Sequence, residues 1–262
     1  MNDDDVLLFE AIGPVARVTL NRPKAMNALN LAILAELDRR LTEIAASDEL
    51  RVLIVTGAGS AFCAGADLKE VLAGQRLGPG EADFLDRANV TYGRLRNFPK
   101  PVIAVLNGVT MAGGLELAMC ADIVVAAESA TIADAHANFG VYPGAGGAAI
   151  LPRLIPLNMA MYLLLTGKSL SAAEMKACGL VCEVHPDAAL ADAALKLATH
   201  IAKKCPVALR RMKEVARASA DKSRDDALSH EQVMLRAHMR SFDFHEGLQA
   251  FAEKRAPQFQ GR

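Results

Sequence analysis

The sequence of 262 residues contains no tryptophan, and aromatic residues make up only 5% of it. Its 29 lysines and arginines are balanced by 30 aspartates and glutamates, so no strong net charge is present to attract an anionic partner. We therefore expect no nucleic-acid partner, because such proteins combine basic surfaces with aromatic side chains. The longest apolar stretches, such as Met159–Leu165, are too short to span a bilayer, and no membrane association is expected.

The five cysteines form no Cys-x-x-Cys pair, and their odd number argues against a complete disulfide framework. Reduced thiols in a cytosol-like compartment are the expected state. The acidic start of the chain is not followed by the apolar core of a signal peptide, so we expect a cytoplasmic protein. The histidines lack metal-ligand spacing, and no metal site is expected.

Hydrophobic residues make up 52% of the chain and charged residues 23%, a balance typical of a compact globular protein. The length allows either one large α/β domain or an α/β core with a smaller subdomain. In the first two-thirds of the chain, short apolar runs typical of strands alternate with stretches of helical periodicity. Helical patterns dominate the last third. The pattern therefore predicts an α/β core followed by a helical C-terminal region.

The chain is organised around residues 107–122, where a pair of glycines lies between two strand-like runs. The apolar run of residues 101–106 leads into this stretch. Gly113 and Gly114 precede a helix-compatible segment, so the first N–H groups of that helix would be unpaired and not covered by side chains. With the positive end of the helix dipole, they could stabilise a developing negative charge. Glu116 follows one turn later, either as a carboxylate near the bound group or as a solvated or capping residue.

A second loop rich in small residues, Ser60–Asp67, also follows a strand-like run. If it meets the glycine pair, one N–H from each loop would form a two-donor oxyanion hole, which stabilises the enolate of a thioester. Each donor in such a hole contributes about 2.7–4 kcal/mol in known cases. Glu116 would then supply the acid or base near Cα or Cβ of the acyl group. Cys63 lies in this loop without a neighbouring base in the sequence, so we interpret it as a packing residue.

Five motifs, in order along residues 6–259, resemble the enoyl-CoA hydratase/isomerase (crotonase) family. They occupy residues 20–29, 61–70, 107–122, 143–147 and 251–255. The resemblance implies an α/β fold with a crotonase-like spiral core of repeated ββα units and a helical C-terminal region. Residues 1–200 would form the core that binds the acyl-CoA, and residues 201–262 would serve trimerisation and closure of the pocket. A homotrimer or a dimer of trimers is the implied assembly.

The resemblance also implies which residues form the site. Ala64 and Gly113 match the two residues whose N–H groups form the family's oxyanion hole, and Glu116 matches the first of two glutamates that hydratases use to activate and deliver water. Residues expected to contact the substrate or its coenzyme A moiety are Arg22, Lys24, Ala25, Ala66, Asp67, Leu68, Gly114 and Lys254. Lys254 would approach coenzyme A bound to a neighbouring subunit. Coenzyme A is part of the substrate, so no separate cofactor is implied.

One position departs from the family. The second glutamate of the hydratases lies seven residues before the proline of the Pro-Gly-x-Gly-Gly motif, and here that position is His136. A histidine could act as an acid or base near neutral pH. Asp134 could replace the missing carboxylate or orient the imidazole. Alternatively, His136 lines the pocket or is structural, and catalysis depends on Glu116 alone.

The function that the resemblance implies is an enzyme acting on acyl-CoA thioesters. Hydration of a 2-enoyl-CoA to a 3-hydroxyacyl-CoA is the expected reaction, with Glu116 as acid and base. An isomerase, hydrolase or decarboxylase using Glu116, His136 or both remains an alternative, because each passes through an enolate or oxyanion. A non-catalytic acyl-CoA-binding paralogue is the alternative from another class, although it would have no need of Glu116. The loop at residues 74–90 is expected to border the acyl pocket.

Overall fold

The computed structural model describes residues 5–74 and 83–262. Its larger sheet has six strands in the order β1-β2-β3-β5-β7-β10. β1 and β2 form an antiparallel hairpin, and the other pairs in this sheet are parallel. The strands are β1 (Leu7–Ile12), β2 (Val15–Leu20), β3 (Val52–Gly57), β5 (Val102–Leu106), β7 (Ile123–Ala127) and β10 (Glu183–His185). The hairpin and the parallel strands that follow agree with the expected α/β core.

A smaller sheet has four strands in the order β4-β6-β8-β9. These strands are β4 (Ala61–Cys63), β6 (Val109–Met111), β8 (Thr131–Ala133) and β9 (Leu170–Ser171). Three consecutive strand pairs, β3–β4, β5–β6 and β7–β8, each place their first strand in the larger sheet and their second in the smaller one. The helices α2 (Leu68–Gly74), α3 (Phe84–Arg96) and α4 (Gly113–Ala118) follow the first two pairs. This repetition confirms the ββα units implied by the resemblance.

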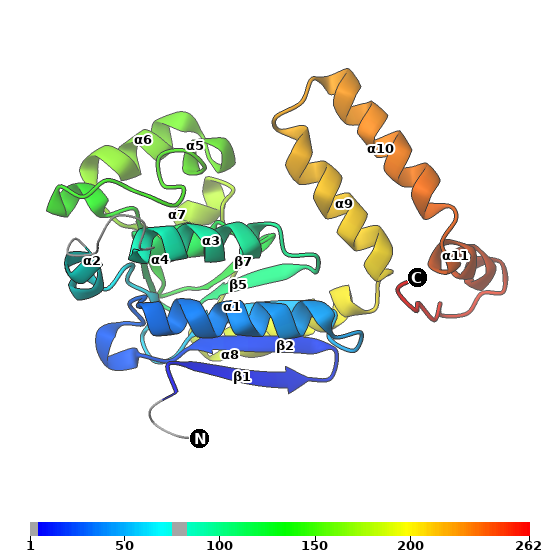
Figure 1. Ribbon diagram of the computed structural model, residues 1–262, viewed down its shortest axis with the longest axis horizontal. Coiled ribbons are helices and arrows are strands. Elements are labelled where there is room, and N and C mark those ends of the chain that lie inside the picture. The colour runs from blue at the N-terminus through cyan, green and yellow to red at the C-terminus, as the bar shows by residue number, and fades with distance from the viewer. Residues whose placement is uncertain (1–4, 75–82) are drawn as a thin grey trace.

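Helices cover the larger sheet. α1 (Leu31–Ala46) begins at Asn30, whose side chain accepts a hydrogen bond of 2.9 Å from the N–H of Ile33, as expected for a cap. Its apolar face is fully buried, and α8 (Asp187–Ala202) packs against β3, β5 and β7 (Figure 1). All five residues of β5 are buried, because a parallel strand in the centre of such a sheet is covered on both faces.

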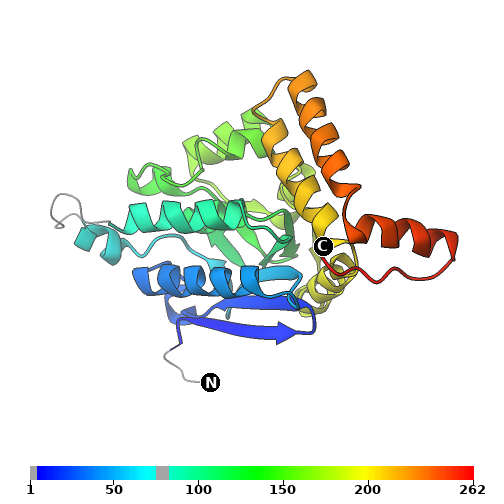
Figure 2. The ribbon, with the colours of Figure 1, turned by 45° about the vertical axis from the view of Figure 1, so that its right-hand side comes forward.

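Beyond β8 the chain is mostly helical. The shorter helices of this part are η2 (His136–Phe139), α5 (Leu151–Leu154), α6 (Leu157–Thr166) and α7 (Ala172–Ala177). The last three helices, α9 (Pro206–Ser219), α10 (Arg224–His238) and α11 (Phe242–Ala252), form an arm that projects from the core (Figures 1 and 2). The arm is fixed to the core by Lys213, whose ammonium lies 2.7 Å from the Asp122 carboxylate. The expected boundary at residue 200 falls in the last turn of α8.

Two expectations about local structure need adjustment. The sequence analysis did not predict β6 (Val109–Met111), which lies between the apolar run of residues 101–106 and the glycine pair. Such a short strand is stabilised by pairing with β4 and β8, which its own residues do not indicate. Within the expected acyl-pocket loop at residues 74–90, residues 75–82 lie outside the described part of the chain.

Candidate active site

The carboxylate of Glu116 is buried and held by a loop from elsewhere in the chain. Its residue is 4% exposed, and its Oε1 accepts hydrogen bonds from the N–H groups of Ala145 (2.8 Å) and Gly147 (2.9 Å). Both donors belong to the Pro-Gly-x-Gly-Gly motif. The interpretation of Glu116 as a solvated or capping residue is therefore wrong. Its Oε2 has no hydrogen-bond partner among the described residues, which leaves this oxygen available for proton transfer.

The two loops of small residues meet, as the sequence predicted. A Cβ added to Gly113 would lie 3.4 Å from the backbone nitrogen of Ala66. In the described part of the chain, no acceptor is bonded to the N–H of Ala66 or to that of Gly113. The N–H of Ala64, by contrast, donates to the carbonyl of Met26 at 3.0 Å. The prediction of Ala64 as an oxyanion donor is therefore wrong, because its N–H is already paired, whereas Ala66 two residues later offers a free one.

Gly114 has a packing role that requires glycine. A Cβ at this position would lie 2.0 Å from the carbonyl oxygen of Cys63, so α4 approaches β4 too closely for any side chain. Contact between Gly114 and substrate stays a prediction. Burial raises the pKa of the Cys63 thiol to about 12, which keeps it protonated and agrees with a packing residue rather than a nucleophile.

Tyr92 of α3 contacts the glycine pair Gly113-Gly114 through its hydroxyl. Its hydroxyl donates a hydrogen bond of 2.8 Å to the carbonyl of Gly113. Burial, followed by the nearby Cys63, Glu116 and Cys120, raises the pKa of Tyr92 well above its ordinary value, so the phenol remains a donor. Ala112, the residue before Gly113, has a φ of +49°, a strained conformation for a residue with a side chain. The start of α4 is thus held in an unusual backbone geometry by a buried partner.

His136 and Asp134 form a pair beside this site. The Nδ1 of His136 lies 2.9 Å from Oδ1 of Asp134, and the aspartate is 1% exposed. Burial lowers the pKa of His136, but the hydrogen bond and charge of Asp134, together with the charge of Glu116, outweigh this effect and raise it overall. Of the alternatives left open by the sequence, the geometry matches an aspartate that orients the imidazole.

The loops expected to contact coenzyme A lie against each other. Arg22 donates to Asp67 (3.0 Å) and to the carbonyl of Ala28 (2.7 Å). The N–H of Asp67 donates to the carbonyl of Leu29 at 2.7 Å, which links the two loops through the backbone. The guanidinium of Arg22 is therefore engaged within the protein. Lys24, in the short helix η1 (Pro23–Ala25), is exposed, and so is Leu68 at the start of α2.

Lys254 does not join these loops within one chain. It follows α11 at the end of the arm, whereas η1 and α2 lie on the opposite side of the molecule (Figures 1 and 2). Its expected contact with coenzyme A on a neighbouring subunit stays a prediction.

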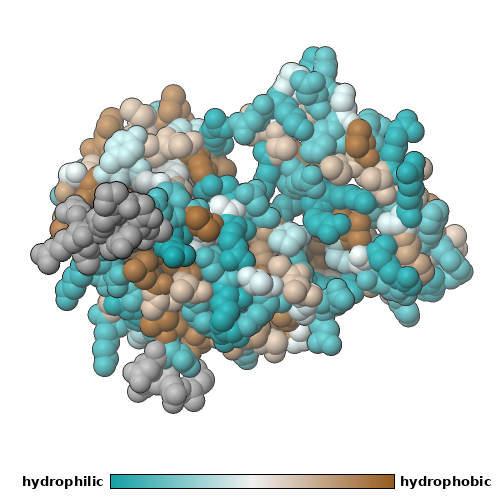
Figure 3. All heavy atoms as spheres, viewed as in Figure 1, coloured by the Kyte–Doolittle hydropathy of each residue, from teal (hydrophilic) through white to brown (hydrophobic). Residues whose placement is uncertain are grey.

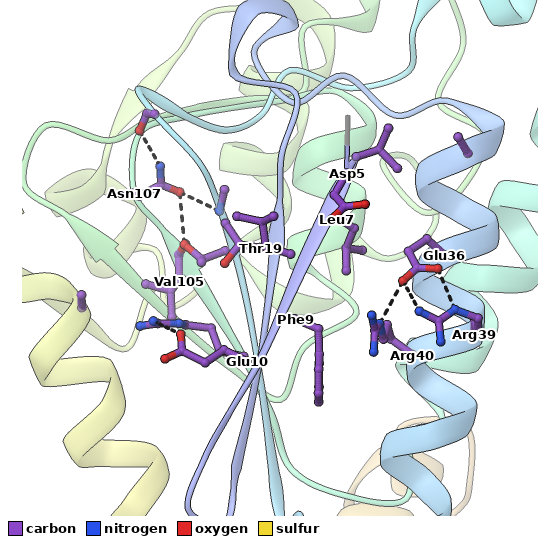
Figure 4. A pocket seen from close by; sticks show the side chains of 18 of the residues that line it. Asp5, Leu7, Phe9, Glu10, Thr19, Glu36, Arg39, Arg40, Val105 and Asn107 are labelled. Atoms are coloured by element: carbon purple, nitrogen blue, oxygen red, sulfur yellow. Dashed lines mark hydrogen bonds and ion pairs between the residues drawn. The ribbon is translucent and has the colours of Figure 1, made fainter. Parts of the chain in front are cut away.

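A large open cavity lies elsewhere, along β1. It measures about 1230 Å³ and is lined by Phe9, Glu10, Glu36 and Asn107, among others (Figure 4). Glu10 pairs with Arg17, and Glu36 pairs with two arginines of α1, so these charged side chains are partnered. The cavity does not include Glu116, Gly113 or His136.

Some residues of the site were not identified from the sequence. Tyr92 was missed because a tyrosine within a helical pattern gives no sign of its hydrogen-bond partner. Asn27 is fully buried and donates to the carbonyls of Ala58 (2.9 Å) and Ala61 (2.7 Å), which joins the segment between η1 and α1 to the start of β4. The Pro-Gly-x-Gly-Gly motif was recognised, but nothing in it indicated that its amides bind Glu116.

The geometry is matched by comparisons with known proteins. The sequence pattern described as Enoyl-CoA hydratase/isomerase matches residues 10–262. The chain belongs to the enoyl-CoA hydratase/isomerase family. It is 37% identical over 258 residues to a probable enoyl-CoA hydratase from Mycobacterium tuberculosis, covering 98% of this chain and 99% of that protein. The crotonase fold and the enzymatic character of the chain follow from this membership.

Other relatives within the family have different names. Over 252 residues the chain is 36% identical to 2,3-dehydroadipyl-CoA hydratase from Escherichia coli, covering 95% and 96% of the two chains. Over 254 residues it is 37% identical to 1,2-epoxyphenylacetyl-CoA isomerase from the same organism, covering 95% of each. The crystal structure of an enoyl-CoA hydratase from Bacillus anthracis superposes with a TM-score of 0.91 at 37% identity, covering 98% of this chain and 100% of that one.

Two observations concern the chain as a whole. In residues 5–74 and 83–262, no helix is long and apolar enough to cross a membrane. Over the same residues, no cluster of three or more histidine, cysteine, aspartate or glutamate side chains could hold a metal ion.

Proposed function

We propose that this enzyme hydrates a 2-enoyl-CoA to a 3-hydroxyacyl-CoA. The observation that supports this reaction is the buried carboxylate of Glu116, with Oε1 fixed by two amides and Oε2 without a partner among the described residues. A carboxylate held in this way can orient a water molecule and accept its proton. The relatives named as hydratases favour the same reaction, whereas the isomerase among them marks the principal alternative.

The amides of Ala66 and Gly113 would bind the thioester oxygen. As the water oxygen bonds to Cβ, the π electrons of the double bond move through the carbonyl onto that oxygen, and Glu116 takes one proton from water. The enolate then collapses as Cα accepts a proton. Each amide would contribute about 2.7–4 kcal/mol to stabilising the enolate, because the donors are fixed before charge develops.

The coenzyme A moiety would lie along the joined loops. We propose that the exposed Lys24 and the neighbouring Ala25 and Leu68 contact it, while the Arg22–Asp67 pair fixes the shape of both loops. Ala66 would contribute through its N–H rather than through its side chain. No separate cofactor enters this scheme.

We also propose that the chain assembles as a homotrimer or as a dimer of trimers. Apolar side chains remain exposed on the arm, among them Val233 (62%), Leu248 (57%) and Phe251 (86%). Figure 3 shows apolar residues scattered among hydrophilic ones on this part of the surface. An interface between subunits would cover these side chains. The arm would thereby serve trimerisation, close the pocket and bring Lys254 to a neighbouring site. Light scattering on the purified protein would test the assembly.

The reaction is tested by mixing the purified enzyme with crotonyl-CoA and following the absorbance of the conjugated thioester. We expect rapid loss in the wild type and loss of turnover in Glu116→Gln, whose affinity for the thioester should survive because its shape is unchanged. Equal turnover in the variant would exclude Glu116 from the mechanism. If the wild type leaves crotonyl-CoA unchanged, assays for a shifted double bond, for free coenzyme A and for carbon dioxide identify the isomerase, hydrolase or decarboxylase reaction.

A further inference from the structure

We propose that Asp134 is a positioning residue that makes His136 the second proton-transfer group of the site, in place of a second carboxylate. The proposal rests on the hydration reaction above, in which Cα must receive a proton. It concerns His136, which stands where the hydratases have their second glutamate, and its neighbour Asp134, and it follows from the way in which this chain holds the imidazole.

Asp134 makes two hydrogen bonds with His136, one with its ring and one with its backbone. Its Oδ1 lies 2.9 Å from Nδ1 of the ring and accepts a weaker hydrogen bond of 3.4 Å from the backbone N–H of His136. A carboxylate can only accept here, so Nδ1 carries the proton in the neutral as well as the charged imidazole. Nε2 is left as the nitrogen that gains and loses a proton. Among the described residues, Nε2 has no hydrogen-bond partner.

The backbone between these residues is strained in a way that brings their side chains together. Ala135 has a φ of +61°, in the left-handed region that residues with a Cβ rarely adopt. Such strain persists where the surrounding structure holds it, and it concentrates at functional sites. Here it allows side chains two positions apart to face each other.

The His136–Asp134 pair lies close to Glu116, and Gly147 separates the carboxylate of Asp134 from that of Glu116. A Cβ added to Gly147 would lie 2.5 Å from Oδ2 of Asp134, while the N–H of Gly147 donates to Glu116 at 2.9 Å. The Oδ2 atom is buried without a hydrogen-bond partner in the described part of the chain. A carboxylate buried in this way needs a compensating charge, and protonated His136 is the group placed to supply it.

Charge therefore favours a protonated imidazole. The charged groups that act on the ring are Asp134 from the segment after β8 and Glu116 from α4, and both raise the pKa of His136 against the effect of burial. During hydration, Nε2–H of the imidazolium would donate its proton to Cα as Glu116 accepts a proton from water. The products of this step are a neutral imidazole and a carboxylic acid, and transfer of the proton from Glu116 to His136 through solvent restores the starting state.

The test uses Asp134→Asn, which keeps the shape of the side chain and removes its charge. In enzyme labelled with ¹⁵N-histidine, the signal of His136, assigned with His136→Gln, should titrate at lower pH in the variant, and its neutral form should lose the preference for a proton on Nδ1. The kcat of the variant should fall by about 10- to 100-fold, part of the 10²–10⁴-fold that a positioned acid contributes. The alkaline limb of its pH profile should move to lower pH. Asp134→Glu should restore part of the kcat and part of the shift of the alkaline limb.

A matched control exists on β10. Nε2 of His185 lies 2.8 Å from Oε2 of Glu183, a histidine–carboxylate pair with the same two-residue spacing but exposed and outside the site. Glu183→Gln should leave the pH profile and the His136 signal unchanged.

The outcomes separate this proposal from the proposed reaction. If the wild type hydrates crotonyl-CoA and Asp134→Asn keeps its rate and pH profile, the role of Asp134 is excluded and the hydratase function stands. If no enoyl-CoA is hydrated, the reaction is excluded, and with it the proton transfer to Cα. An unchanged His136 titration in Asp134→Asn would by itself overturn the positioning role.

Discussion

The hydroxyl of Tyr92 donates a hydrogen bond of 2.8 Å to the carbonyl oxygen of Gly113, so a buried side chain of α3 holds the first residue of α4. Gly113 is also the residue whose N–H faces the proposed thioester oxygen. The two backbone groups of Gly113 therefore have different roles. Its carbonyl accepts the hydrogen bond from Tyr92, which fixes the position of the glycine, and its N–H is available to bind the developing negative charge.

This relationship predicts the effect of Tyr92→Phe. Removing the hydroxyl leaves the buried carbonyl of Gly113 with one donor fewer, which costs about 1–3 kcal/mol. We expect a lower melting temperature and a decrease in kcat that exceeds any change in KM, because the N–H of Gly113 loses its fixed orientation. Tyr162→Phe is the control, since Tyr162 is 40% exposed on α6. Equal melting temperatures and kcat values in the two variants would contradict the role given to Tyr92.

The two adjacent glycines should respond differently to a methyl group. In Gly113→Ala the new Cβ would lie 3.3 Å from the Tyr92 hydroxyl and 3.4 Å from the Ala66 nitrogen, distances that small shifts accommodate. The methyl group would nevertheless occupy the space in front of the Ala66 N–H. We expect a folded protein whose kcat falls by about 10²–10³-fold, as for loss of one oxyanion donor.

In Gly114→Ala the Cβ would lie 2.0 Å from the carbonyl oxygen of Cys63, and backbone atoms would have to move. We expect this variant to be strongly destabilised, so that its loss of activity follows its loss of structure. Thermal unfolding and the crotonyl-CoA assay, measured on both variants, distinguish the two cases. A stable Gly114→Ala or a fully active Gly113→Ala would be incompatible with the packing described here.

We expect the segment that follows α11 to detach from this helix at low pH. Glu246 of α11 accepts two hydrogen bonds from Arg255 (2.6 and 2.9 Å) and one from the N–H of Gln258 (2.6 Å). The hydrogen bonds from Arg255 lower the pKa of Glu246 to about 2. Because this value lies below the ordinary 4.5, the stabilisation is complete above about pH 4.5 and is lost as the pH falls through about 2.

Amide hydrogen exchange at neutral pH measures how firmly Glu246 and Arg255 hold the segment that follows α11. In Arg255→Met, the amide of Gln258 should exchange faster than in the wild type, because Glu246 loses its main partner. Lys254→Met is the neighbouring control and should leave this amide unchanged, since Lys254 makes no described contact with Glu246. If both variants exchange alike at Gln258, the ion pair does not hold the segment.

Much of the fold could be predicted because it depends on local periodicity. The apolar residues of α1, from Ile33 to Ile44, recur with helical spacing and lie on one buried face, and Asn30, a residue type preferred at the N-cap, caps that helix. The local pattern Ser-x-x-Glu likewise marks the start of α7, where Ser171 and Glu174 form a capping box. β6 was missed because its three residues are held in place by neighbouring strands rather than by their own pattern.

The features of the site also fall into those that local sequence predicts and those that depend on tertiary contacts. The sequence by itself determined that a helix starts at a glycine pair, that Glu116 lies in its first turn and that His136 occupies the place of a glutamate, because each depends on spacing along the chain. Only the tertiary structure decided that, among the described residues, the N–H of Ala66 has no acceptor whereas that of Ala64 has one, since this acceptor, Met26, is remote in sequence. It likewise decided that the loop at residues 145–147 holds Glu116. Hydrogen-bond availability is set by which distant residues meet in space, and local sequence does not contain that information.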